Sequence, residues 1–272
     1  MTLPRIGVFD SGVGGLTVLR ALANQVPAHY LYFGDTARLP YGTKSAETVA
    51  RYAIGAARFL EKQGIDLLVV ACNSATALAL PEITQAVLVP VVGVIEPGAA
   101  MASEVSKTRS AIVIATEATV DSHAYREALL RLGMEGHEKA CPLLVPLVEE
   151  GWIDHPVTEQ VAQIYLDEAT AASSGLADVL VLACTHYPLL APLLRRITPA
   201  RVNIVDSAES TAQVVKAMLP SLPLGAKSPG NVQLDHRTFH FFVTDSVEKF
   251  KRLATRFLGR QVDRVEHVDL GG

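Results

Sequence analysis

Short apolar runs rich in valine, isoleucine and leucine alternate along the chain with alanine-rich segments of helical period. A parallel strand buried on both faces is apolar throughout, whereas a helix lying on a sheet repeats its apolar residues every three or four positions. The predicted strands are residues 5–9, 30–34, 66–71, 90–95, 111–115, 178–183, 203–205 and 240–244. The clearest helices are residues 15–25, 45–63, 122–132, 157–172, 210–218 and 247–258, and further helices fill the intervals. The alternation predicts an α/β fold of mostly parallel sheets flanked by helices.

The sequence also contains an internal repeat. Residues 66–72 (DLLVVAC) are echoed by 178–184 (DVLVLAC), which places Cys72 and Cys184 112 positions apart. Residues 5–11 align with 109–116, and 92–96 with 202–206, at offsets of 106 and 110. Three echoes in nearly one register predict two pseudo-symmetric lobes. We expect lobe 1 at residues 1–96, lobe 2 at 97–206, and residues 207–272 returning to lobe 1 through a Pro, Gly and Ser-rich loop at 222–233.

Ligands of parallel α/β sheets bind beyond the C-terminal ends of the strands. The unusual polar residues of this chain fall at such ends: Asp10, Ser11, Asp35, Cys72, Asn73, Ser74, Glu96, Thr116, Cys184, Thr185, His186 and Asp206. If the two lobes face each other, one cleft receives a thiol from each side. The repeat therefore predicts an active site in the cleft between the lobes.

Charge and composition exclude several classes of protein. The 272 residues hold 24 Lys and Arg against 28 Asp and Glu, a net charge of −4, so no positive field draws in nucleic acid. With 49% hydrophobic and 19% charged residues, the chain is not disordered. The longest apolar stretch, residues 86–95, is broken by Pro90 and is too short to span a membrane. The N-terminus lacks the pattern of a secretory signal, so we expect a cytoplasmic protein with no membrane partner.

The three cysteines do not form a disulfide framework and indicate a reducing compartment. Cys141 lies in the apolar run ACPLL and is predicted to pack in the core. Cys72 and Cys184 are instead each followed by polar residues at a strand end that leads into a helix. A helix N-terminus lowers the pKa of a thiol, so we expect both thiols to be activated.

Two thiols across a cleft could form a redox pair, bind a metal, or act as acid and base on a substrate carbon. A redox pair lacks a Cys-x-x-Cys motif, and a metal held by Cys72, Cys184 and His186 lacks a closely spaced ligand pair. In the third alternative one thiolate removes a proton from a stereocentre and the opposite thiol returns one to the other face. Since that chemistry is symmetric like the repeat, we expect a racemase or epimerase without a metal.

The run DSGVGGLT at residues 10–17 invites assignment as a nucleotide-binding loop. The third glycine of a dinucleotide fingerprint would fall at Thr17, however, and Asp10 places a negative charge where a phosphate would approach. The plain alternative is that Ser11 caps a helix while the glycines permit a tight turn, whose N–H groups could hold a small carboxylate. No lysine occupies a position that suggests pyridoxal phosphate, so we expect no cofactor.

Five blocks resemble the glutamate racemase family, part of the aspartate/glutamate racemases. They are residues 7–15 (GVFDSGVGG), 32–42 (YFGDTARLPYG), 71–76 (ACNSAT), 146–151 (PLVEEG) and 183–188 (ACTHYP). The resemblance implies cofactor-independent interconversion of L- and D-glutamate for peptidoglycan, by a homodimer of two-lobed subunits. Some members carry an N-terminal extension linked to activation by a cell-wall precursor; this chain begins at its first strand, so we do not expect that control.

Carried over by position, Cys72 would take the proton from D-glutamate and Cys184 from L-glutamate. Asp10 and His186 match assisting residues, and Glu149 matches an acidic position near the second thiol. The implied substrate contacts are Asp10, Ser11, Tyr41, Gly42, Asn73, Ser74, Thr185 and His186, with Thr116 and Thr119 as further candidates. Ser74 departs from the family's usual threonine but keeps the hydroxyl. The residues alone leave open a racemase of aspartate or a hydantoin, and a two-lobed amino-acid-binding protein without turnover.

Overall fold

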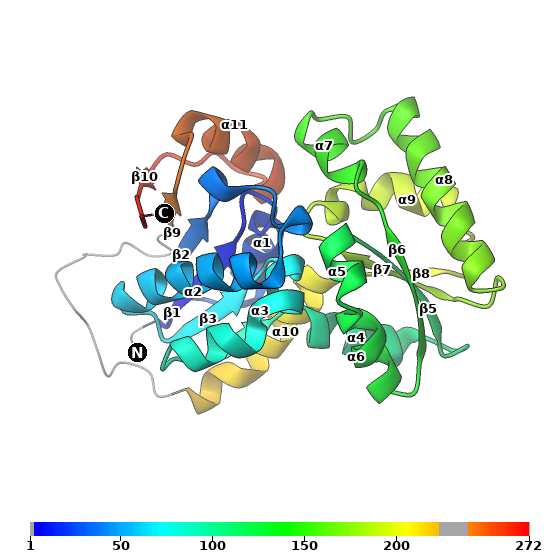
Figure 1. The fold of residues 1–272 in the computed structure, drawn as a ribbon, viewed down its shortest axis with the longest axis horizontal. Coiled ribbons are helices and arrows are strands. Elements are labelled where there is room, and N and C mark those ends of the chain that lie inside the picture. Colours follow the sequence, from blue (N-terminus) through cyan, green and yellow to red (C-terminus); the bar gives the residue numbers. More distant parts are fainter. Residues whose placement is uncertain (1–2, 223–238, 272) are drawn as a thin grey trace.

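The computed structural model describes residues 3–222 and 239–271, which form two parallel sheets flanked by helices (Figure 1). The strands are β1 (Arg5–Asp10), β2 (His29–Gly34), β3 (Leu67–Val70), β4 (Val91–Gly93), β5 (Ser110–Ala115), β6 (Glu135–Ala140), β7 (Val179–Ala183), β8 (Asn203–Asp206), β9 (Phe239–Val243) and β10 (Val265–His267). The helices are α1 (Leu16–Gln25), α2 (Ala46–Lys62), α3 (Asn73–Ala86), α4 (Ile95–Val105), α5 (Glu117–Asp121), α6 (Ala124–Arg131), α7 (Leu144–Glu149), α8 (Pro156–Ala172), α9 (Ala191–Ile197), α10 (Ser207–Met218) and α11 (Val247–Leu258). Most of the predicted loop, from residue 223 to 233, lies outside the described residues.

The two sheets share one strand order. The first is β10-β9-β2-β1-β3-β4 and the second is β6-β5-β7-β8, with every neighbouring pair parallel. Strands β1 to β4 therefore repeat as β5 to β8, in agreement with the echoes in the sequence. Cys72 and Cys184 follow β3 and β7, the two strands that correspond. Strand β9 extends the first sheet by pairing with β2.

Successive side chains of a strand point to opposite faces of the sheet, so the core of the first sheet is divided into two clusters, one on each face. Ile6 and Val8 of β1 pack with α1 and α11, whereas Phe9 points to the opposite face and packs with α2 and α3. The first of these clusters continues into the second sheet through Ile112 and Leu180. A continuous core thus joins the two sheets beneath the edge where the thiols lie. Within the described part of the chain, no helix is long and apolar enough to cross a membrane.

Two of the observed strands were not predicted from the sequence pattern. Strand β6 reads EGHEKA, and strand β10 is three residues long and largely exposed. Both lie at sheet edges, where solvent covers part of the strand and apolar side chains are not needed. The predicted strand at residues 90–95 was also too long, because α4 already begins at Ile95.

Asp178 fixes the loop that enters β5 and provides a test of stability against acid. The buried carboxylate accepts hydrogen bonds from Ser106 Oγ at 2.6 Å, Lys107 N–H at 2.7 Å, and Thr108 N–H at 3.1 Å and Oγ1 at 2.8 Å. Burial alone raises the pKa of Asp178, but these donors outweigh it and lower the pKa to about 2. Because an unfolded aspartate titrates near a pKa of about 3.9, this stabilisation is complete above that pH and is lost as the pH falls toward 2.

Asp178→Asn is therefore expected to lower the free energy of unfolding by about 1 to 2 kcal/mol at pH 7, and the difference from the parent is expected to shrink between pH 4 and pH 2. Urea denaturation at pH 7, 4 and 2.5 measures it. The matched control is Asp66→Asn at the corresponding position of the repeat, where the described residues supply one donor, Arg5 N–H at 2.8 Å. Equal losses in the two variants, or a difference independent of pH, would contradict this account.

Candidate active site

The C-terminal ends of the two sheets enclose a cavity of about 370 Å³ that both thiols line. Its wall is formed by Ser11, Leu39, Pro40, Tyr41, Gly42, Thr43, Cys72, Asn73, Ser74, Thr116, Glu117, Pro142, Val145, Pro146, Glu149, Cys184, Thr185, His186 and Lys249. These residues come from both halves of the repeat. The cavity thus occupies the cleft in which the sequence predicted the site.

Cys72 is the N-cap residue of α3. Its sulfur accepts a hydrogen bond from Ala75 N–H at 3.5 Å, and its thiol donates to Ser11 Oγ at 3.5 Å. These contacts are those expected of a thiol at a helix N-terminus. Burial nevertheless raises the pKa of Cys72 to about 12, with the nearby charge of Asp10 adding to the rise. The expectation of a lowered pKa was wrong, because desolvation of the thiolate outweighs the helix terminus.

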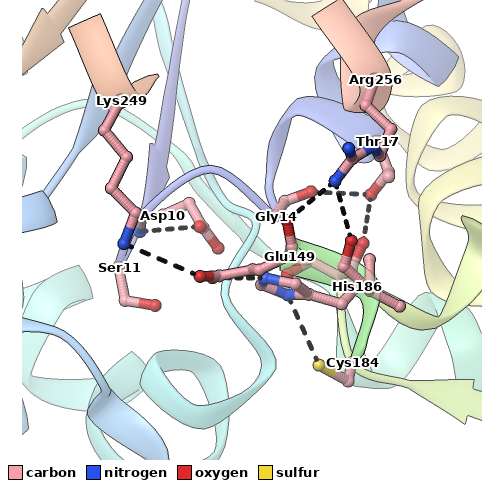
Figure 2. A network of polar contacts seen from close by, with 12 residues as sticks. Asp10, Ser11, Gly14, Thr17, Glu149, Cys184, His186, Lys249 and Arg256 are labelled. Carbon is pink, nitrogen blue, oxygen red and sulfur yellow. Dashed lines mark hydrogen bonds and ion pairs between the residues drawn. The ribbon is translucent and has the colours of Figure 1, made fainter. Parts of the chain in front are cut away.

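Cys184 has a different environment. A 3-10 helix, Tyr187–Leu190, separates it from α9, so the expected α-helix N-terminus is absent at this thiol. Its sulfur lies 3.9 Å from His186 Nδ1, and His186 Nε2 lies 3.2 Å from Glu149 Oε1 (Figure 2). Burial lowers the pKa of His186, but the contacts with Cys184 and Glu149 prevail and raise it to about 10. The hydrogen bond with His186 in turn lowers the pKa of Glu149, so an imidazolium lies between a carboxylate and a sulfur.

Two buried polar groups beside Cys72 each retain an atom without a partner among the described residues. Asp10 Oδ2 accepts from Gly12 N–H at 2.8 Å, whereas its Oδ1 is unpaired. Asn73 Oδ1 accepts from Tyr125 O–H at 2.8 Å, whereas its Nδ2 is unpaired. Burial raises the pKa of Asp10. One spare acceptor and one spare donor in the same dry region suit a ligand that carries both an ammonium and a carboxylate.

A cluster of hydroxyl groups forms another part of the wall. Ser74 Oγ lies 2.9 Å from Thr116 Oγ1 and 3.4 Å from Thr119 Oγ1, and the two threonines lie 3.0 Å apart. Thr119 is fully buried behind the other two and does not line the cavity. Tyr41 lines it, but its hydroxyl donates to the buried Asp35 at 2.6 Å, so Asp35 holds the loop that carries Tyr41.

Four other residues singled out in the sequence do not line the cavity. Glu96 forms an ion pair with Arg131 on an exposed surface, and Asp206 caps α10 through Ala208 N–H and Glu209 N–H. Cys141 is fully buried in the core, which confirms the prediction that it packs. Asp10 is buried just behind the cavity wall.

The glycine-rich loop differs from its expected role. Ser11 does not cap α1, whose N-cap is Gly15, but contacts Cys72. Glycines 12, 14 and 15 have no left-handed backbone. Gly14 is instead needed for a close approach, since a Cβ there would lie 2.1 Å from Thr185 Oγ1 and 2.6 Å from His186 Nδ1. Thr17, which the sequence did not single out, completes this contact by donating from Oγ1 to the Thr185 carbonyl at 2.9 Å.

Helix α11 supplies two further residues that the sequence analysis missed. Lys249 lines the cavity, with its Nζ 4.0 Å from Glu149 Oε2, although the sequence pattern gave no reason to place a lysine there. Arg256 donates to the carbonyls of Val148 and Glu149. These contacts join residues 100 or more positions apart, and no local signal in the sequence predicts them.

Comparison with known proteins agrees with this geometry. Residues 6–215 match the family model Asp/Glu/Hydantoin racemase. The curated glutamate racemase of Koribacter versatilis is 59% identical, over 99% of this chain and 98% of its own. Among solved structures, the glutamate racemase of Thermus thermophilus in complex with β-chloro-D-alanine is 43% identical, with a TM-score of 0.83 over 98% of this chain and 97% of its own. That of Francisella tularensis in complex with D-glutamate is 31% identical, with a TM-score of 0.86 over 99% of each chain. The chain belongs to the Asp/Glu/Hydantoin racemase family, and within it to the glutamate racemases.

Proposed function

We propose that the protein interconverts L- and D-glutamate without a cofactor, with Cys72 and Cys184 as the two bases. The observation that carries this proposal is that two free thiols, from corresponding strands of the repeat, line one cavity. The choice of glutamate is supported by relatives of 59% and 31% identity, the second of which was solved with D-glutamate.

Starting from L-glutamate, the thiolate of Cys184 removes the proton from Cα, and the electron pair left on Cα spreads into the α-carboxylate. The thiol of Cys72 then delivers its proton to the opposite face of the planar carbon. The products are D-glutamate, a Cys184 thiol and a Cys72 thiolate, so one proton has entered and one has left. The reverse reaction begins with the Cys72 thiolate.

The polar groups of the cavity would stabilise the charge that develops on the substrate. Asn73 lines the cavity, and its unpaired Nδ2 would donate to a carboxylate of the substrate. Asp10, just behind the wall, would attract the substrate ammonium by its charge. The hydroxyls of Ser74 and Thr116 offer further donors. In a site closed to water such fixed dipoles act more strongly than in solution.

The two thiols have different surroundings. With a pKa raised to about 12, Cys72 holds its proton at neutral pH and is ready to act as the acid. Cys184 instead lies beside the ring of His186, with its sulfur 3.9 Å from Nδ1. A substrate ammonium near Asp10 would offset the cost of a Cys72 thiolate.

We further propose that the product serves peptidoglycan synthesis and that the protein works in the cytoplasm as a homodimer. The family resemblance supports these assignments. Size-exclusion chromatography with light scattering would measure the oligomeric state, and a monomer at micromolar concentration would contradict the dimer.

Incubation in D2O tests the reaction itself. Purified protein with L-glutamate and no added cofactor is expected to yield D-glutamate labelled with deuterium at Cα, followed by NMR and a chiral assay. Parallel incubations with L-aspartate and a 5-substituted hydantoin are expected to give turnover at least about 100-fold slower. Faster turnover of either would transfer the proposal to that substrate, and binding of glutamate without label or inversion would indicate a binding protein.

A further inference from the structure

Helix α11 extends from the first sheet to the segment of the second half that carries Glu149. Arg256 Nη1 donates to the carbonyl of Val148 at 3.0 Å and to that of Glu149 at 2.8 Å (Figure 2). These carbonyls lie at the C-terminal end of α7, where Val148 O also accepts from Gly151 N–H at 3.0 Å. A cation at this end also complements the helix dipole. Arg256 thus fixes the backbone from which the Glu149 side chain projects.

The turn after α7 is shaped around this guanidinium. Gly151 has a φ of +88°, in the left-handed region that favours glycine. A Cβ at Gly151 would also lie 2.6 Å from Arg256 Nη2. The positive φ requires the glycine, and the guanidinium of Arg256 fills the space beside it.

The same helix approaches the Glu149–His186 pair at two more points. Lys249 Nζ lies 4.0 Å from Glu149 Oε2, while His186 takes the other oxygen of that carboxylate. The ring of Phe257 packs edge-on against His186, with 5.1 Å between ring centroids. Arg256 and Phe257 follow Lys249 by seven and eight residues, about two helical turns, so all three lie on the side of α11 that faces the Glu149–His186 pair.

We propose that Arg256 and Lys249 are positioning residues for the proton-transferring group of the second half: α11 holds Glu149, Glu149 orients His186, and His186 contacts the sulfur of Cys184. This inference rests on the proposed function. Neither residue transfers a proton. Arg256 fixes the main chain of Glu149 and has the larger effect, while the half-exposed Lys249 acts on the carboxylate by charge alone.

Arg256→Met is expected to lower kcat about 30-fold with KM changed less than about 3-fold, since the ground-state contacts of the substrate remain, and Lys249→Met is expected to lower kcat about 3-fold. Arg256→Lys, which keeps one cationic donor, is expected to restore part of the loss. The matched control is Lys251→Met on the same helix, where Nζ pairs with Glu248 and does not reach the other half. It is expected to keep the parent activity.

A double-mutant cycle with Glu149→Gln identifies the path of the effect. If Arg256 acts through the Glu149 carboxylate, Arg256→Met adds less than about 2-fold to the loss already caused by Glu149→Gln. A merely structural role would add its full 30-fold factor in the double variant. Full additivity, or an unchanged kcat in Arg256→Met, would overturn the proposal.

A second measurement does not depend on turnover. Iodoacetamide alkylation of the substrate-free protein, followed by peptide mass spectrometry from pH 7 to pH 10, reports each thiol separately. Arg256→Met is expected to change the rate at Cys184 about 5-fold and that at Cys72 less than about 1.5-fold, because Arg256 is linked to Cys184 through Glu149 and His186. The other charged side chains at the cavity are Glu117, Lys249 and, behind its wall, Asp10. Equal changes at both thiols would indicate general loosening and overturn the positioning role. If the parent failed to racemise glutamate, the proposed function would fall while this selective effect could still be measured.

Discussion

Replacing either Cys72 or Cys184 with serine is expected to lower kcat for glutamate racemisation by about 10⁴-fold or more. The serine hydroxyl keeps the shape of the thiol, but it is far too weak an acid to form the required anion near neutral pH. Each thiol alone serves one face of Cα, so the other cannot replace it. Circular dichroism of glutamate solutions measures the loss in both directions, and the far-UV spectrum of the variant reports its fold.

The control for this pair is Cys141→Ala. Cys141 is buried in the core and does not line the cavity, so the variant is expected to keep kcat within about 2-fold while losing about 1 kcal/mol of stability. If a single serine variant at Cys72 or Cys184 retained more than about one tenth of the parent rate, that result would contradict the two-base mechanism.

Gly14→Ala is expected to lower kcat/KM about 100-fold or more, although it adds only one methyl group. The added Cβ would lie 2.1 Å from Thr185 Oγ1 and 2.6 Å from His186 Nδ1, so both residues must move away from the loop. Gly14 does not have a left-handed backbone, and alanine can adopt its conformation. The loss would therefore come from the shifted site and not from backbone strain.

The same steady-state assay, with thermal unfolding recorded alongside, checks this prediction. Gly55→Ala is the matched control, because the nearest atom to its added Cβ, Leu270 Cδ1, lies 3.9 Å away and the position is inside α2. That variant is expected to be fully active and to gain about 0.5 to 1 kcal/mol of stability. A fully active Gly14→Ala enzyme would show that the close approach of loop and His186 is dispensable.

The central strands could be predicted because burial on both faces leaves an unbroken apolar run in the sequence. Strands β1, β3, β5 and β7 are of this kind, and all four were found. Edge strands give no such signal, and β6 and β10 were missed. The repeat could be read because corresponding strands kept both their apolar character and the thiol that follows them.

The parts of the site that sequence could predict are those set by local order, such as a cysteine directly after a strand. Contacts between segments that are distant in the chain could not be predicted from the sequence. Lys249 meets Glu149 across 100 positions, and Thr17 meets the Thr185 carbonyl across 168. Neither lysine nor threonine is unusual in an amphipathic helix, so only the folded chain reveals them.

The direction of the pKa shift of Cys72 could not be predicted from the sequence either. A helix N-terminus is visible in the residue pattern, and its effect on a thiol has a known direction. How deeply the sulfur is buried, and how near a second negative group lies, depends on packing. Here burial of the sulfur, with a smaller effect of the nearby Asp10, raises the pKa of Cys72 and reverses the expected direction.

A strand order common to β1–β4 and β5–β8 is what duplication of an ancestral gene segment leaves behind. The ancestor would have been a half-length chain whose two copies paired, each contributing the same cysteine. Such a pair treats mirror-image substrates alike, which suits a reaction between enantiomers of equal energy. In the present chain the two halves are no longer equivalent, because Asp10 lies near the Cys72 sulfur and His186 lies beside that of Cys184.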